Sequence, residues 1–212
     1  VGRQFLAFTD RVDAGSSFAS PPDPAPFVNV VDGGQQDQRF AAVSDDELRL
    51  VFYDDGIWTS VRQARATPFA GPTSLVPLNN ASDPYLLPGG DIVFFATGDS
   101  IQSVSLDGST AVRFQPAAEN AFAPVVTADG LTMYFQSNRD PDGGAPRAND
   151  TGIWVVHRNR TVDNFARGDV RYVPELETPT HDAPRWISPD GCRLYLRRDD
   201  PGQGIYVARK RR

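Results

Sequence analysis

The sequence repeats one motif four times, and this repetition constrains the fold more strongly than any other feature of the chain. Each copy has a short apolar strand, a polar turn, a second strand with an aromatic end, and a third strand that begins with Gly-Ile in three of the copies. The polar turns begin at Ser44, Leu87, Thr127 and Ser188, which are 43, 40 and 61 residues apart. A motif that returns in the same order at such a period is typical of an array of similar structural units.

Four short strands are predicted in each copy. In the third copy they fall at residues 124–126, 133–135, 152–155 and 170–173, where β-branched and aromatic residues are frequent and turn residues flank every run. Such a unit is too small to be stable alone, but several of them packed around an axis form a β-propeller with short, protected sheet edges. A β-sandwich also has short strands, yet it gives no reason for one four-part motif to recur. We therefore predict an all-β fold, a β-propeller of four-stranded antiparallel blades.

The two ends of the chain decide the predicted number of blades. The fourth copy reaches residues 209–212 without an outer strand, and residues 27–31, with the sequence Phe-Val-Asn-Val-Val, can supply one. We therefore prefer four blades in a single propeller domain over residues 27–212, with the ring closed by this N-terminal strand. Residues 1–26 are then an N-terminal extension or a partial blade. If residues 4–9 and 17–19 are inner strands, the ring has five blades instead.

The repeated turns and strands resemble the TolB-type, WD40-like β-propeller repeat of bacterial proteins. The likeness covers residues 38–212 and rests on the Ser-Pro-Asp-Gly turn at 188–191, its counterparts in the other copies, and the Gly-Ile-Tyr or Gly-Ile-Trp strands. It implies an extracytoplasmic protein, periplasmic or attached to the cell envelope, that binds protein partners or carries no assigned activity. The second copy has Leu-Pro-Gly-Gly at 87–90 in place of an Asp-containing turn, so we expect its blade to be irregular.

The repeated residues also have a purely structural interpretation. Side-chain oxygens of Ser and Asp accept hydrogen bonds from nearby backbone amides, Pro presets φ, and Gly or Asn adopts positive φ. The aromatic residues after the turns are expected to wedge between neighbouring blades, where each contributes about 2–3 kcal/mol by burial. These residues are Phe52, Phe94, Tyr134 and Tyr195. Most of the motif is therefore interpreted as core and turn.

Charge and composition disfavour several classes of partner. The 21 basic and 27 acidic residues give a net charge of −6, which disfavours nucleic acid because phosphate backbones require clustered Lys and Arg. No apolar run approaches the ~20 residues that cross a bilayer. The single cysteine, Cys192, excludes an intrachain disulfide framework. We expect a monomer.

Residues for nucleophilic catalysis are scarce. A Ser-His-Asp mechanism needs a histidine beside a nucleophile, and the chain has only His157 and His181. We expect His157 to be a polar, outward-facing residue of a third strand, whereas His181 precedes the innermost strand of the fourth copy. No Gly-x-Ser-x-Gly elbow is present, and Cys192 is interpreted as a packed small thiol beside a turn.

Acidic residues near the inner strands support one enzyme hypothesis. Asp37, Asp83 and Asp182 are expected just before inner strands, and Asn120 occupies the equivalent place in the third copy. Glycoside hydrolysis uses a pair of carboxylates, so a small carbohydrate-active propeller is the alternative function. One acid in each copy at the same repeat position is also what repetition alone produces. We therefore favour a structural role, in which these side chains accept hydrogen bonds from a neighbouring blade.

The leading hypothesis is a non-catalytic scaffold that binds a protein partner or a small ligand at the mouth of the central channel. Arg185 stands beside Trp186, and a cation next to an aromatic ring is typical of binding surfaces. The candidate binding residues are Asp37, Asp83, Asn120, His181, Asp182 and Arg185. No cofactor is expected except calcium, for which the hard oxygens of Asp140, Asp142 and Asp150 are candidates. A solvated hairpin is the preferred interpretation of those three residues.

Overall fold

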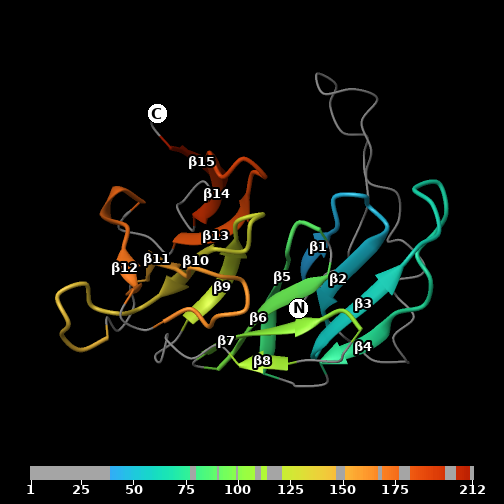
Figure 1. Ribbon diagram of the computed structural model, residues 1–212, viewed down its shortest axis with the longest axis horizontal. Helices are drawn as coiled ribbons and strands as arrows, with labels where there is room; N and C mark the ends of the chain where they lie inside the picture. Colours follow the sequence, from blue (N-terminus) through green and yellow to red (C-terminus); the bar gives the residue numbers. More distant parts are fainter. Residues whose placement is uncertain are drawn as a thin grey trace.

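The computed structural model describes residues 39–76, 80–89, 91–98, 100–107, 111–113, 121–146, 151–166, 169–176, 182–198 and 204–210. Within these residues the chain forms fifteen strands in four separate antiparallel sheets, with one short 3-10 helix, η2 (Pro174–Leu176). Figure 1 shows the sheets following one another along the chain, from the blue first sheet to the red fourth. In the described part of the chain there is no helix long and apolar enough to span a membrane.

Each sheet is built from strands that are consecutive in the sequence. The first sheet contains β1 (Arg39–Val43), β2 (Arg49–Tyr53), β3 (Ile57–Val61) and β4 (Thr73–Val76). The second contains β5 (Ala81–Leu86), β6 (Ile92–Thr97), β7 (Ser100–Ser105) and β8 (Ala111–Arg113). The third contains β9 (Ala121–Val126), β10 (Thr132–Ser137), β11 (Gly152–His157) and β12 (Arg171–Tyr172). The fourth has three described strands, β13 (Asp182–Ile187), β14 (Arg193–Arg198) and β15 (Gly204–Arg209).

The first strand of each sheet packs against the sheet before it. Strand β5 contacts β1 and β2, β9 contacts β5 and β6, and β13 contacts β9, β10 and β11. This face-to-face succession is that of propeller blades, and it confirms the predicted all-β fold of four-stranded antiparallel units. Among the described strands, β1 and β13 do not pack in this way. The closing strand at residues 27–31 and the partial blade at 1–26 lie outside the described residues, so the number of blades and the closure stay predictions.

The core lies between the sheets. One apolar cluster joins the second, third and fourth sheets, and a smaller one joins the first and second. Met133, Phe135 and Ile153 in the larger cluster are at most 1% exposed. Side chains of this size contribute about 1.5–3 kcal/mol each when fully buried. Burial between sheets is therefore the main source of stability for units that are too small to fold alone.

The predicted turn chemistry is confirmed in three copies. In the third copy, the Thr127 hydroxyl donates to Asp129 Oδ1 (2.6 Å), which also accepts from the Leu131 amide (2.9 Å). The Thr132 amide donates to Thr127 Oγ1 (3.1 Å), so both side chains tie the turn to its own backbone. The equivalent contacts in the first and fourth copies join Ser44 with Asp46 and Ser188 with Asp190. Gly130 and Gly191 have positive φ, as expected, and Glu47 adopts a φ of 61° at the equivalent position of the first copy, which holds neither Gly nor Asn.

The second copy was expected to be irregular, and this prediction is wrong for its strands. Strands β5 to β8 form a complete sheet with continuous pairing apart from one bulge, which is common to all four inner strands. Only the turn differs, because Leu87 and Gly89 have no side-chain oxygen and Gly89 has a φ of 104°. The backbone bond from the Leu87 amide to the Ile92 carbonyl (2.9 Å) still closes this turn, so the strand register does not depend on the side-chain contacts.

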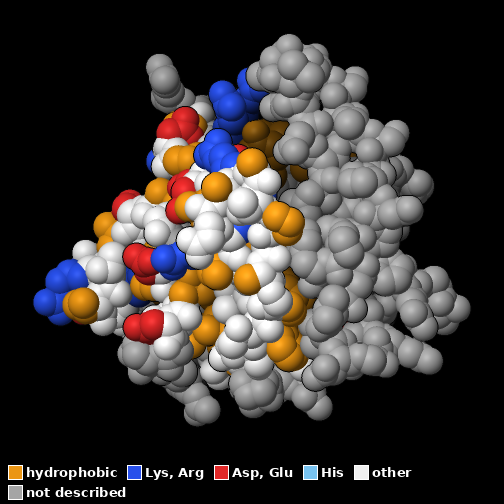
Figure 2. Space-filling model, turned by 90° about the vertical axis from the view of Figure 1, so that its right-hand side faces the viewer, with side chains coloured by type: hydrophobic (Ala, Val, Ile, Leu, Met, Phe, Trp, Pro, Cys, Tyr) orange, Lys and Arg blue, Asp and Glu red, His pale blue; other side chains and the backbone are white. Residues whose placement is uncertain are grey.

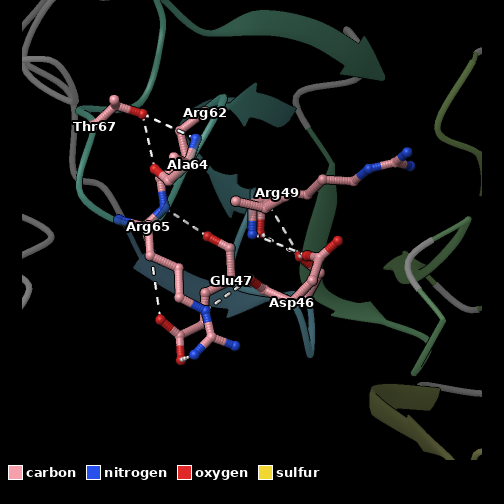
Figure 3. Close-up of polar contacts among 9 residues, drawn as sticks. Asp46, Glu47, Arg49, Arg62, Ala64, Arg65 and Thr67 are labelled. Carbon is pink, nitrogen blue, oxygen red and sulfur yellow. Dashed lines mark hydrogen bonds and ion pairs between the residues drawn. The ribbon is translucent and has the colours of Figure 1, made fainter.

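An arginine after the third strand clamps the turn in two of the copies, a feature that the sequence analysis did not identify. In the first copy, Arg62 Nε donates to the Glu47 carbonyl (2.7 Å; Figure 3). The Arg62 guanidinium lies 4.7 Å from the centre of the Phe69 ring. In the third copy, Arg158 Nε donates to the Gly130 carbonyl (2.7 Å) and lies 4.4 Å from the Phe165 ring. In the sequence, the signal for this clamp was an Arg that is followed seven residues later by a Phe in both copies.

The aromatic residues predicted to wedge between blades do not share one register position. Phe94, Tyr134 and Tyr195 occupy equivalent places, because each pairs with the inner-strand residue that precedes the last one. Phe52 lies one residue later and therefore on the opposite face of its sheet. Phe52 and Phe94 are buried, whereas Tyr134 and Tyr195 are only partly buried. The four aromatic residues therefore do not all pack on the same face of their sheets.

Candidate functional site

A β-bulge interrupts all four inner strands at the same place. In β1, β5, β9 and β13, two inner-strand residues oppose one residue of the second strand. The bulged residues Phe40, Asp83 and Ala123 have positive φ, at 52°, 49° and 49°. A bulge of this kind bends the strand and redirects a side chain, and bulges are frequent beside functional sites. Here they redirect side chains on the inner strands of the four sheets.

One redirected side chain forms an ion pair between two sheets. Arg185 Nη1 on β13 lies 3.0 Å from Asp83 Oδ1 on β5, and both side chains are largely shielded from solvent. The Arg185 guanidinium also lies 5.1 Å from the centre of the Phe40 ring on β1. Side chains from the first, second and fourth sheets therefore meet at one point, although Asp83 and Arg185 are 102 residues apart in sequence. This group is the polar centre of the candidate site.

A cavity of about 320 Å3 opens beside this group. It is lined by residues 41–45 of the first sheet, residues 84–88 of the second, and Arg185 and Trp186 of the fourth. Trp186 is 42% exposed and packs edge-on against Tyr195, with ring centres 5.1 Å apart. Asp45 is exposed at the rim. An exposed aromatic ring and a carboxylate thus border a hollow formed by three inner strands.

Tyr85 lines the cavity but is already engaged. Its hydroxyl donates to the Val126 carbonyl of the third sheet (2.9 Å), and the residue is 5% exposed. Burial, with a smaller contribution from the negative charge of Asp45, raises the pKa of Tyr85 far above its usual range. The phenol therefore stays protonated and fixes two neighbouring sheets, which gives the cavity a rigid wall.

The second candidate acid forms a separate pair within the fourth sheet. Asp182 is 1% exposed, and Arg198 Nε lies 3.3 Å from Asp182 Oδ1. The Arg198 guanidinium in turn lies 4.6 Å from the centre of the Tyr206 ring. Asp182 is thus a buried carboxylate that holds the start of β13 beside the end of β14.

Two expectations about these acids are corrected by the strand register. Asp83 is the third residue of β5 and Asp182 is the first residue of β13, so neither stands before its strand. Asp182 faces Arg198 at the register position of Ala81 and Thr97 in the second sheet, whereas Asp83 lies in the bulge. The two acids are therefore not repeat equivalents. Both have arginine partners, in place of the backbone contacts to a neighbouring blade that the sequence suggested.

Three of the six candidate binding residues lie inside the described part of the chain. Asp83 and Arg185 meet across the site, and Asp182 lies in its own pair. Asp37, Asn120 and His181 lie outside the described residues, and their proposed roles stay predictions. The structure adds Phe40, Asp45 and Tyr85 to the site. The sequence signals the bulge only in the second and third copies, where Pro84 and Pro124 follow the bulged residue. Phe40 in the first copy is not followed by a proline.

The remaining chemical candidates have local roles. His157 is exposed, as expected, and its Nδ1 lies 2.9 Å from the Thr132 hydroxyl. The Cys192 thiol is partly buried beside the fourth turn, 3.5 Å from the Asp190 carbonyl. Among the described residues there is no cluster of three His, Cys, Asp or Glu side chains that could hold a metal ion. Asp140 Oδ1 accepts from the Asp142 amide (3.1 Å), whereas Asp150 lies outside the described residues, so calcium binding stays untested.

The visible surface has mixed charge. On the described part of the face in Figure 2, acidic and basic side chains are interspersed among polar and apolar ones.

A second cleft, of about 680 Å3, lies between the third and fourth sheets and is lined by Tyr134, Leu176, Cys192 and Lys210 among others. Burial raises the pKa of Tyr134 above its ordinary value.

The fold is similar to that of known β-propellers. No protein-family model matches the sequence, and neither does any curated protein. TolB of Acinetobacter baumannii is similar over 82% of this chain and 41% of its own, with a TM-score of 0.55 and 16% identity. A TolB-like protein of Agrobacterium tumefaciens is similar over 83% of this chain and 78% of its own, with a TM-score of 0.50 and 13% identity.

A third solved β-propeller is similar to this chain to the same degree. The β-propeller domain of Cps50 (Swd1) from Myceliophteria thermophila is similar over 83% of this chain and 55% of its own, with a TM-score of 0.50 and 10% identity. This chain thus spans less than half of the Acinetobacter TolB chain and little more than half of the Swd1 domain. At such identities the likeness concerns the fold alone. The chain has a β-propeller architecture of the kind found in TolB and WD40 proteins.

Proposed function

We propose that this protein is a non-catalytic binding scaffold whose channel mouth receives a segment of a protein partner. Similarity to TolB and WD40 propellers supports a binding role at the level of fold. The earlier resemblance of the repeat to bacterial envelope propellers supports a location in the periplasm or at the cell envelope. The partner site is the cavity bordered by Asp45, Arg185 and Trp186.

The observation that carries this proposal is the pairing of Asp83 with Arg185 at 3.0 Å. The pair joins the second and fourth sheets and gives the cavity a polar centre. Trp186 and Asp45 then remain at the rim as exposed groups for contact. An aromatic ring beside a carboxylate favours a segment that presents a basic side chain next to an apolar one.

The same pairing weighs against the carbohydrate-active alternative. Glycoside hydrolysis needs one carboxyl group that donates a proton and a second that acts as base or nucleophile. Asp83 and Asp182 are each held by an arginine, at 3.0 Å and 3.3 Å. A carboxylate in such a pair is not placed to exchange protons with a sugar or with water. Asp37, the remaining acidic candidate, lies outside the described residues.

A capture experiment with matched variants tests the proposal. The full chain is immobilised and exposed to an envelope extract of its source organism, in parallel with an Asp83→Asn/Arg185→Gln variant. Asn tolerates the positive φ at position 83, and the double change removes both charges without leaving one unpaired. We expect a partner captured by the unchanged protein to be lost, with affinity reduced at least tenfold, the effect of losing about 1.4 kcal/mol of binding free energy.

The control neutralises a different Arg–Asp pair. Arg160 and Asp163 are 2.7 Å apart in the loop after β11, away from the channel, and an Arg160→Gln/Asp163→Asn variant should capture the same partner as the unchanged protein. Equal capture by both variants would show that binding does not use the channel mouth. Hydrolysis of glycoside substrates that disappears in the Asp83→Asn/Arg185→Gln variant would instead support the enzyme alternative.

A further inference from the structure

The cleft between the third and fourth sheets has apolar walls. The third sheet contributes Tyr134 on β10 and Leu176 of η2, and the fourth sheet contributes Leu194 on β14. Leu194 is buried, whereas Tyr134 and Leu176 are only partly buried. A volume of about 680 Å3 with such walls is typical of pockets that hold a small organic molecule. We call this hollow the intersheet cleft.

Backbone amides around the intersheet cleft already have partners. The Val173 amide donates to the Ile153 carbonyl (3.0 Å), and the Leu176 amide donates to the Val173 carbonyl (3.1 Å). On the fourth sheet, the Lys210 amide donates to the Cys192 carbonyl (3.0 Å). These three amides offer no hydrogen bond to the backbone of a bound peptide. The walls therefore favour an apolar group, which needs no hydrogen bond.

Lys210 occupies the position of the clamp arginine. Its amide bonds to the Cys192 carbonyl as the Arg158 amide bonds to the Leu131 carbonyl in the third copy. The Arg158 guanidinium packs against the ring of Phe165, which is 2% exposed. Within the described residues, the fourth copy has a cation at this position but no aromatic ring packed on it.

The space beside the fourth turn is open as a result. A methyl group built on Gly130 in the third copy would lie 3.3 Å from the Arg158 guanidinium, whereas one built on Gly191 would have no described atom within 4 Å. Cys192 is also smaller than Leu131, its equivalent in the third copy. The fourth turn thus leaves room where an arginine fills the third.

The charges around the intersheet cleft favour an anionic ligand. Arg209 and Lys210 line it and are exposed, and within the described residues neither forms an ion pair. Glu175 is the one acid among the described residues that line it, so the cations exceed the acids by one. An adjoining hollow of about 300 Å3 beside Lys210 carries the carboxylates of Asp129 and Asp190. An anionic group is therefore best placed on the Arg209 side.

We propose that the intersheet cleft binds a small aromatic carboxylate. The ring of this ligand packs against Lys210 as Phe165 packs against Arg158, and its carboxylate lies beside Arg209. A cation over a ring is attracted by the negative charge of the ring face, and the apolar walls bury the rest of the ring. Among the described residues, this site shares no lining residue with the channel mouth, and it does not rest on the proposed function.

Calorimetric titration of the full chain with 2-naphthoate tests the proposal, with its saturated form, decahydro-2-naphthoate, as the matched ligand. Both acids carry one charge, but only the first has an aromatic ring. Lys210→Gln should raise the Kd of 2-naphthoate about tenfold and that of the saturated acid about twofold, because the second lacks the cation–ring attraction. Lys210 is exposed, so we expect this variant to fold as the unchanged protein does. Arg171→Gln, an exposed position outside the cleft, should leave both Kd values unchanged.

Other results of the titration overturn the proposal. Failure of the unchanged protein to bind 2-naphthoate would show that the intersheet cleft is not an aromatic carboxylate site. A Kd unaffected by Lys210→Gln would place the ligand elsewhere. Equal weakening of both acids would show that the site recognises charge and not an aromatic ring.

The single cysteine of the chain locates the bound acid independently. Cys192 lines the intersheet cleft, and its thiol is only partly buried. 2-Naphthoate at about ten times its Kd should slow the alkylation of this thiol by iodoacetamide about tenfold, because a covered thiol does not react. The rate is measured by mass spectrometry of the intact protein. An alkylation rate that 2-naphthoate does not change would contradict binding in this cleft.

Discussion

The third and fourth sheets contain the same motif but differ in what covers it. Both begin a third strand with Gly-Ile, yet Ile153 is 1% exposed and Ile205 is 64% exposed. In both, the second strand has a tyrosine that pairs with the inner-strand residue before the last one; these residues are Tyr134 and Tyr195. The repeat therefore determines strand and turn locally, whereas burial depends on the sheet that follows.

The two sheets also differ at the point where the inner strand begins. In the third sheet, Ala121 faces Ser137, and both are fully buried. In the fourth, Asp182 faces Arg198, and the acid is buried while the arginine is partly exposed. A small, nearly apolar pair is thus replaced by an ion pair in the sheet with less cover. Partial exposure of Arg198 reduces the cost of removing its charge from water.

The largest expected effect tests burial directly. Ile153→Asp places a charge in the core between the third and fourth sheets and should destabilise the protein by about 4–5 kcal/mol or more. Ile205→Asp should lower the free energy of unfolding of the sheets by less than about 1 kcal/mol, because this position faces outward. Urea unfolding followed by tryptophan fluorescence measures both values. If Ile205→Asp unfolds the sheets as Ile153→Asp does, the fourth sheet is as deeply covered as the third.

Local features of these sheets could be predicted from the sequence. The Ser188 and Asp190 contacts depend on residues within five positions of each other, so the Ser-Pro-Asp-Gly pattern was sufficient to predict them. The strands bounded by these turns were predicted for the same reason. The exposure of Ile205 could not be predicted, because the Gly-Ile-Tyr pattern predicts a buried strand wherever it occurs.

The candidate site was predicted only in part. Asp83 and Arg185 were both identified, but their contact depends on a bulge in each inner strand and on the arrangement of three sheets. Neither is encoded by a local pattern. Asp182 was assigned to the same repeat position as Asp83 because sequence spacing cannot show that one of them lies in a bulge. The Asp83–Arg185 contact and the position of Asp182 both depend on pairing between residues that are far apart in the sequence.

An intermediate effect is expected when the fourth sheet is given the pair of the third. Asp182→Ala should cost about 2–3 kcal/mol, because Arg198 loses its partner in a largely buried place. The double variant Asp182→Ala/Arg198→Ser recreates the pair formed by Ala121 and Ser137, and it should recover at least half of that loss. Equilibrium unfolding in urea measures the difference. A double variant no more stable than Asp182→Ala would show that the ion pair itself is not what the fourth sheet requires.

The smallest expected effect concerns a feature that both sheets share. Hydrogen bonds from the Thr127 hydroxyl and the Leu131 amide lower the pKa of Asp129 below its ordinary value of 3.8. The Ser188 hydroxyl and the Cys192 amide lower the pKa of Asp190 in the same way. Because each pKa is lower in the folded protein, the unfolded chain binds the proton more readily. The stabilisation is complete above the unfolded pKa and is lost as the pH falls through the folded value.

Acid titration therefore tests whether the hydrogen bonds of Asp129 and Asp190 within their turns are independent of the sheet that follows. The free energy of unfolding should fall as the pH is lowered from about 5 to below 3.8, and Asp129→Asn and Asp190→Asn should each make this fall shallower by a similar amount. Similar amounts are expected because both carboxylates accept from donors within their own turn, whatever sheet follows. Asp163→Asn is the reference, since the pKa of Asp163 is lowered mainly by Arg160 and not by a turn. A shallower fall in one turn variant alone would mean that the neighbouring sheet controls the turn as well as the core.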